Sequence, residues 1–153
     1  MMQNTLYQYC PKLAVFNAAR TELLLCRRKG ELDYDSVFSL IGGKMEHKDA
    51  SIVEALRREK NEEVGEGFVL RLLATHSVDV PFIKKDGTRM ILPHFYAEHH
   101  RGEVQLNDEY SEFRWVGLEY LKSFTPMIEN IAWIVPLLLR GAIHANPDEF
   151  IEI

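Results

Sequence analysis

The sequence contains few cysteines and no long apolar segment, and both shortages exclude classes of protein. Its 153 residues include two cysteines, Cys10 and Cys26, too few for a disulfide scaffold and without the spacing of a metal site. The most apolar segment, residues 131–139, is far shorter than the roughly 20 residues that span a bilayer. Residues 1–11 lack the basic start and apolar run of a signal peptide. We therefore expect a cytoplasmic protein without a membrane anchor.

Positive charge is also scarce, since 18 Lys and Arg residues stand against 23 Asp and Glu residues, for a net charge of -5. Binding to a nucleic-acid backbone needs a concentrated excess of basic residues, so we do not expect nucleic acid as a partner. The 46% of hydrophobic residues are enough for a core. Because domains commonly contain about 100 to 150 residues, we expect one domain over residues 1–153.

Short apolar runs bounded by turn residues predict strands in both halves of the chain. They are residues 12–16, 22–27, 37–41, 68–80, 90–100 and 113–116. The first two form a predicted hairpin, and the Asp-Gly pair within residues 84–88 predicts a second one. We interpret Lys84, Lys85 and Arg89 around that turn as solvated, and the aromatic residues Phe38, Phe82 and Tyr96 as core.

Helical spacing of apolar residues appears over residues 51–64 and 129–140. Ser51 followed by Glu54 predicts a capping box at the start of the first helix, and Gly65 predicts its end. The second helix contains Pro136, which we expect it to accommodate with a kink or a break. Helices between and after the strands predict an α/β fold with a mixed sheet flanked by helices.

The helix at 51–64 places carboxylates where its apolar stripe should continue. On a helical wheel, Glu59 and Glu63 share the face of Ala55 and Leu56, and Glu62 lies beside them. Like charges at this spacing repel, and the helix macrodipole disfavours them near the C-terminus. A bound Mg²⁺ or Mn²⁺ would relieve both costs, because hard cations prefer oxygen ligands. The alternative is a solvated acidic end of a surface helix.

Two neighbouring features support the first interpretation. Arg58 lies one turn before Glu62, so its guanidinium could orient a carboxylate; the alternative is an ordinary surface ion pair worth under about 1 kcal/mol. Gly42-Gly43 follows a strand and would let the Gly43 backbone approach an ion or a phosphate. A glycine pair is also consistent with a tight strand exit.

Gly42-Gly43-Lys44-Met45-Glu46 together with Arg58-Glu59-Lys60-Asn61-Glu62-Glu63-Val64-Gly65 resembles the Nudix box. The resemblance implies a Nudix-like α/β/α sandwich and a metal-dependent hydrolase that cleaves a phosphoanhydride bond in a nucleoside di- or triphosphate or a nucleoside diphosphate derivative. By position it implies Glu59, Glu62 and Glu63 as ligands of Mg²⁺ or Mn²⁺, with one of them as a general base. It also implies a small diphosphate-containing molecule as the partner.

The sequence departs from the Nudix pattern in three places. The segment from Gly43 to Arg58 is one residue longer than the pattern, so either Asp49 or Ala50 falls where the first glutamate is expected. Lys60 and Glu66 occupy positions that are apolar in the pattern. A further acidic ligand is expected from a later loop, with Glu112 as first choice and Glu109 as second; the alternative for each is a solvated loop carboxylate.

Other classes of function stay open at this stage. A Nudix-fold module that binds a nucleotide without turnover is the main alternative, although the intact glutamates favour an enzyme. A diphosphate isomerase would want a positioned cysteine, and Cys26 on an early strand is poorly placed. The box does not identify the substrate. A homodimer is also conceivable, through pairing of residues 6–9.

Overall fold

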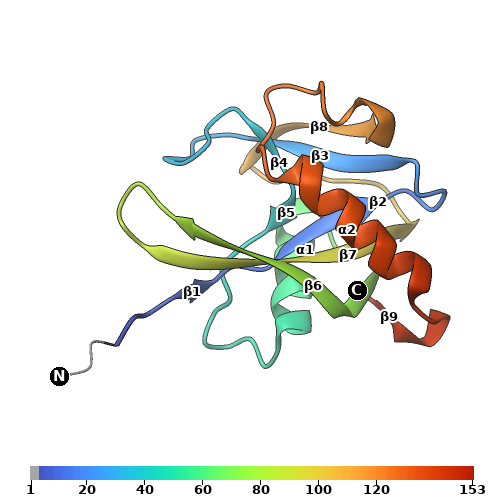
Figure 1. Ribbon diagram of the computed structural model, residues 1–153, viewed down its shortest axis with the longest axis horizontal. Helices are drawn as coiled ribbons and strands as arrows, with labels where there is room; N and C mark the ends of the chain where they lie inside the picture. The colour runs from blue at the N-terminus through green and yellow to red at the C-terminus, as the bar shows by residue number, and fades with distance from the viewer. Residues whose placement is uncertain (1–3) are drawn as a thin grey trace.

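Alternating burial along the central strands determines the layers of the fold. The computed structural model describes residues 4–153. In β2 (Lys12–Phe16), Leu13 and Val15 pack in the core cluster of α1 (Ile52–Val64), whereas Ala14 and Phe16 pack in the cluster of α2 (Ile131–His144). The sheet therefore lies between the two helices (Figure 1), which confirms the predicted α/β/α sandwich.

The remaining elements are short except for one long hairpin. They are β1 (Gln8–Tyr9), β3 (Glu22–Arg28), β4 (Phe38–Ser39), β5 (Ile41–Gly42), β6 (Val69–Ile83), β7 (Arg89–Arg101), β8 (Tyr110–Gly117), β9 (Phe150–Glu152), and the 3-10 helices η1 (Leu118–Tyr120) and η2 (Pro147–Glu149). The sheet order is β4-β3-β2-β7-β6-β9, with β5 beside β2, β8 beside β3 and β1 beside β7. β7 runs parallel to β1 and β2, and the other pairs are antiparallel, so the sheet is mixed as predicted.

The first predicted hairpin, formed by β2 and β3, is paired at a single pair of residues. β2 pairs with β3 at Phe16 and Leu23, but the start of β2 pairs instead with β5, Lys12 opposite Gly42. The predicted strand 37–41 is consequently two strands, because β4 pairs with β3 and β5 with β2. The diverging ends of β2 and β3 leave room for side chains between them.

Two more strands depart from the sequence-based prediction. β9, of three residues, pairs with β6, and β1 pairs with Met90 and Ile91 of β7. Gln8 and Tyr9, part of the segment suggested for pairing across a homodimer, thus pair with β7 of the same chain through one strand edge.

Helix α1 begins and ends at the predicted residues. The Ser51 hydroxyl accepts a hydrogen bond from the Glu54 amide at 3.2 Å, and Gly65, with φ of 100°, donates its amide to the Asn61 carbonyl. The predicted capping box is only half formed, because the Glu54 side chain pairs with Arg57 instead. Helix α2 continues through Pro136. Over residues 4–153, no helix is long and apolar enough to cross a membrane.

Candidate active site

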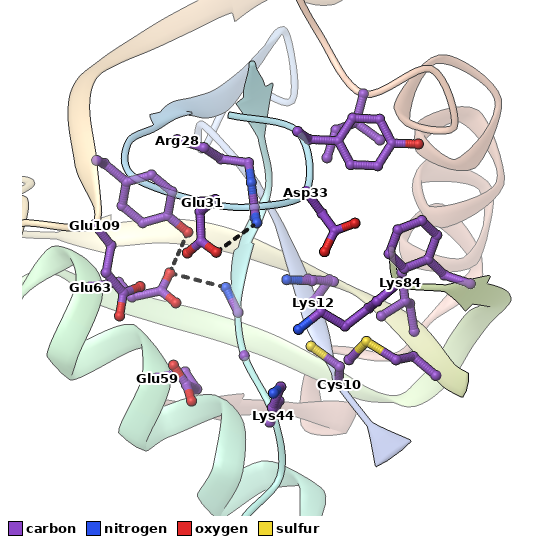
Figure 2. A pocket seen from close by; sticks show the side chains of 18 of the residues that line it. Cys10, Lys12, Arg28, Glu31, Asp33, Lys44, Glu59, Glu63, Lys84 and Glu109 are labelled. Atoms are coloured by element: carbon purple, nitrogen blue, oxygen red, sulfur yellow. Dashed lines mark hydrogen bonds and ion pairs between the residues drawn. The ribbon is translucent and has the colours of Figure 1, made fainter. Parts of the chain in front are cut away.

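A cavity of about 480 Å³ lies where β2 and β3 diverge, beside α1. Lys12 of β2 and Arg28 of β3 lie on its walls, as do the loop after β3 and the hairpin of β6 and β7 (Figure 2). Its lining residues are Cys10, Lys12, Arg28, Glu31, Asp33, Tyr34, Gly42, Gly43, Lys44, Glu46, Glu59, Glu62, Glu63, Phe82, Lys84, Met90, Leu92, Glu109, Tyr110, Ile128 and Asn130. Carboxylates from α1 and apolar side chains of the hairpin thus share one cavity.

Helix α1 contributes all three glutamates of the box to this cavity. Glu63 is 1% exposed and Glu59 is 9% exposed, whereas the Glu62 side chain is 53% exposed. The buried pair lies one helical turn apart on the face that also buries Leu56. The helical wheel therefore placed the buried carboxylates on the correct face, and Glu62 lies at its solvent edge.

Glu63 is held by two hydrogen bonds. The Gly42 amide donates to its Oε2 at 3.2 Å and the Tyr110 hydroxyl donates to the same atom at 2.7 Å. Burial nevertheless raises the pKa of Glu63 to about 8, although the ammonium of Lys12 and both hydrogen bonds oppose the shift. The folded chain keeps this carboxyl protonated at neutral pH unless a cation approaches it.

Gly43 is required by the position of Glu59. A Cβ at residue 43 would lie 2.5 Å from each carboxylate oxygen of Glu59, so any side chain there would displace that carboxylate. The absence of a side chain lets backbone and carboxylate face the cavity together.

Arg58 connects the glutamates to the preceding loop. Its Nε and Nη2 donate to the two oxygens of Asp49 at 3.0 and 2.9 Å, and its Nη1 donates to Glu59 at 2.8 Å and to Glu62 at 3.4 Å. The bidentate pair with Arg58 lowers the pKa of Asp49 to about 2. The insertion puts either Asp49 or Ala50 at the position of the first glutamate of the pattern. Asp49 is the one that pairs with Arg58, because alanine has no carboxylate.

The later loop contributes Glu109 to the cavity and leaves Glu112 outside it. Glu112 lies on β8, where it forms ion pairs with Arg27 at 3.5 Å and Arg114 at 3.8 Å. Glu109 precedes β8 and lines the cavity. Its pKa is raised by partial burial and then by the carboxylates of Glu59, Glu31 and Glu62. Of the two candidates for a further acidic ligand, Glu109 lines the cavity and Glu112 on β8 does not.

The cavity fits a hard divalent cation by its donor chemistry. Glu59, Glu62, Glu63 and Glu109 all line it, and the pKa values of Glu63 and Glu109 are raised, a cost of ionisation that an ion with oxygen ligands would relieve. No three His, Cys, Asp or Glu side chains within residues 4–153 already converge at metal-binding spacing. Arg58 instead donates hydrogen bonds to Glu59 and Glu62.

The sequence interpretation missed much of the rest of the cavity. Phe82 and Lys84, interpreted as core and as a solvated turn, both line it, whereas Phe38 and Tyr96 are core as expected. Lys12 was not singled out at all. Its sequence neighbourhood is an ordinary strand, and its place in the cavity comes from the pairing of β2 with β5 and β7.

The loop after β3 is joined to the β6–β7 turn across the apolar end of the cavity. Asp33, 7% exposed, accepts a hydrogen bond from the Lys85 amide at 3.0 Å, and the Lys85 ammonium donates to the Leu32 carbonyl at 3.0 Å. The rings of Tyr34 and Phe82 face each other with centroids 5.9 Å apart. Two segments that are distant in sequence thus form one wall.

Comparison with known proteins agrees with this geometry. Residues 12–137 match the model of the NUDIX domain. The chain is 30% identical over 128 residues to the nucleoside triphosphatase NudI of Klebsiella pneumoniae strain 342, covering 78% of this chain and 88% of that protein. The chain therefore belongs to the Nudix family, and it is a pyrophosphohydrolase of the Nudix type.

Solved structures share the fold at lower identity. A MutT protein from Methanosarcina mazei Go1 superposes with a TM-score of 0.73 at 23% identity, over 92% of this chain and 99% of that chain. An Ap4A hydrolase from C. elegans gives a TM-score of 0.72 at 16% identity, over 90% and 99%. The NUDIX domain of Shewanella oneidensis NrtR, solved with ADP ribose, gives 0.66 at 14% identity, over 92% and 89%.

Proposed function

We propose that the chain hydrolyses a phosphoanhydride bond of a nucleoside triphosphate, with Mg²⁺ or Mn²⁺ bound by Glu59, Glu62 and Glu63. The burial of Glu59 and Glu63 beside the Gly42-Gly43 backbone, at the mouth of a cavity with an apolar end, carries the proposal. The name of its NudI relatives supports the triphosphate as substrate. The aromatic and aliphatic wall of Phe82, Met90 and Leu92 suits a nucleoside.

The residues of the site divide in this proposal into those that hold the cation and one that orients a ligand. Glu59, Glu62 and Glu63 hold the cation together with the Gly43 backbone, Glu109 supplies a further carboxylate, and Arg58 orients Glu59. When bound, the cation neutralises phosphate charge and lowers the pKa of the attacking water. A carboxylate of this group accepts the proton of that water as its oxygen attacks phosphorus, and the anhydride oxygen leaves with the departing phosphate.

A phosphate-release screen with Mg²⁺ or Mn²⁺ tests the proposal. The panel contains nucleoside triphosphates, nucleotide sugars and dinucleoside polyphosphates. Glu63→Gln should abolish turnover, and Glu66→Gln, which removes an exposed carboxylate outside the cavity, should retain it. Activity on triphosphates that is lost only in Glu63→Gln supports the proposal. Silence across the panel, with nucleotides still raising the melting temperature, would contradict it and favour a nucleotide-binding module.

We also infer that the chain works in a reducing compartment such as the cytoplasm. Cys10 and Cys26 are both buried free thiols. Burial raises the pKa of the Cys26 thiol, which disfavours the reactive thiolate.

A further inference from the structure

Two lysines reach into the cavity from the side opposite the carboxylates. Figure 2 shows the side chains of Lys12 and Lys84 directed into the same space, with Glu59, Glu63 and Glu109 across from them. Arg28, Arg58 and Lys48 each form an ion pair with a carboxylate, whereas among residues 4–153 neither Lys12 nor Lys84 does. Within the described residues the fold thus holds two partly buried positive charges toward the cavity without an ion pair, although Lys12 is near enough to Glu63 to oppose the rise of its pKa.

Strand pairing places Lys12 between the carboxylate end and the apolar end of the cavity. It lies opposite Gly42 of β5 on one side and opposite His94 of β7 on the other. Gly42 donates to Glu63, so this side leads to the carboxylates. Residues two apart on a strand share a face, so Leu92 and Met90 continue from His94 toward the apolar end, where Met90 pairs with Phe82.

Lys84 approaches the same space from the β6–β7 turn. It follows Phe82 by two residues, and its amide donates to the Thr88 carbonyl at 3.0 Å, which anchors the turn. The hydrogen bonds from the Lys85 amide to the Asp33 carboxylate and from the Lys85 ammonium to the Leu32 carbonyl hold the adjoining loop against that turn. The backbone of Lys84, from which the side chain enters the cavity, is therefore held in an ordered hairpin.

We propose that Lys12, together with Lys84, binds the phosphate that adjoins the nucleoside, while the carboxylate end receives the phosphate under attack. This assignment rests on the proposed function, because it assumes a phosphate chain that runs from the apolar end to the carboxylates. A lysine ammonium binds phosphate as a point charge, and the neighbouring His94 does not compete, since burial lowers its pKa to about 4. Lys12 is thus a substrate-binding residue outside the Nudix box.

Calorimetric binding of inorganic pyrophosphate in the presence of Mg²⁺ tests this role. Lys12→Met keeps most of the side-chain volume and removes the charge, Lys12→Arg keeps the charge, and Lys122→Met removes an exposed lysine outside the cavity. Lys12→Met should weaken pyrophosphate binding about 10- to 100-fold, the usual effect of losing a charge-assisted contact. Lys84→Met should weaken it less. Lys12→Arg should bind within a few-fold of wild type, and Lys122→Met should bind like wild type.

Turnover kinetics separate phosphate binding from a structural role. On the triphosphate that the screen identifies, Lys12→Met should raise KM more than it lowers kcat, with an unchanged melting temperature. Unaltered pyrophosphate affinity in Lys12→Met, an equal loss in Lys122→Met, or a wild type that binds neither pyrophosphate nor any nucleoside triphosphate would overturn the assignment. A wild type that hydrolyses no nucleotide but binds pyrophosphate through Lys12 would overturn the proposed function alone.

Discussion

Glu63, a proposed metal ligand, carries a cost to the folded chain. It is buried among Gly42, Tyr110 and the core of α1, and its pKa of about 8 lies well above the ordinary 4.5. Between these values the folded state binds one proton more than the unfolded state. The free energy of unfolding of the metal-free protein should therefore fall as pH rises from about 4.5 to 8.

Glu63→Gln should remove this pH dependence. The amide oxygen can still accept from Gly42 and Tyr110, and nothing ionises. In EDTA at pH 8.5 the variant should be more stable than wild type by on the order of a few kcal/mol, with little difference near pH 4.5. Urea unfolding at both pH values measures this. An equally steep pH dependence in the variant would mean that another group is responsible.

Substitution of Asp49 tests whether, despite the one-residue insertion, this carboxylate holds Arg58 in place beside the glutamates. Asp49→Ala removes both hydrogen bonds from Arg58 and should lower metal affinity or turnover about 10- to 100-fold, as loss of a partner behind a metal ligand usually does. Asp49→Glu should retain more of the activity, because it keeps a carboxylate for Arg58. Asp148→Ala, at an exposed position in η2, is the control. Equal activity in Asp49→Ala and the control would exclude a supporting role.

At the scale of the element, α1 is unusual because its C-terminus buries a lysine where the Nudix pattern has an apolar residue. Lys60 is 1% exposed, and its ammonium donates to the Gly65 and Glu66 carbonyls at 3.3 and 3.4 Å. The negative dipole end of the helix favours a cation there. The side chain thus packs as an apolar residue would, and its charge completes the helix end.

Lys60→Met should separate packing from charge. The variant keeps the apolar stem but removes the ammonium donor from both carbonyls, of which Gly65 keeps the Phe68 amide at 3.3 Å, and should lose about 1 to 3 kcal/mol of unfolding free energy. Lys60→Ala should lose more, because it also creates a cavity. Urea unfolding at pH 7 compares the two. If Lys60→Met matches wild type, the two hydrogen bonds contribute no net stability.

Elements with strong periodicity were predictable, and short paired strands were not. The sequence of residues 51–64 shows both an apolar face at helical spacing and a capping serine. Helix α1 accordingly begins at Ile52, after its cap Ser51, and ends at Val64 as expected. β1, β5 and β9 each contain two or three residues. Such segments carry no periodic signal, because hydrogen bonds from distant strands decide whether they are strands at all.

For the whole molecule, the proposed metal site couples stability to divalent cation and pH. Binding of Mg²⁺ requires Glu63 to ionise, so it should release a proton at pH 7 and strengthen as pH rises toward about 8. Mg²⁺ should also raise the melting temperature, since it binds only the folded chain. Titration calorimetry in buffers of different ionisation enthalpy measures the released proton. A pH-independent affinity, or identical proton release by Glu63→Gln, would contradict the assignment of Glu63.

The sequence by itself determined the common helix face of Glu59 and Glu63 and the fold class, because spacing along the helix and the order of strands and helices carry that information. Only the tertiary structure placed Glu109 in the cavity and Glu112 outside it, paired Asp49 with Arg58, and brought Lys12 and Lys84 into the cavity. These placements depend on where β2 and β3 separate and on how the β6–β7 hairpin contacts the loop after β3. Contacts of that kind join residues that are far apart in the chain, and no local pattern records them.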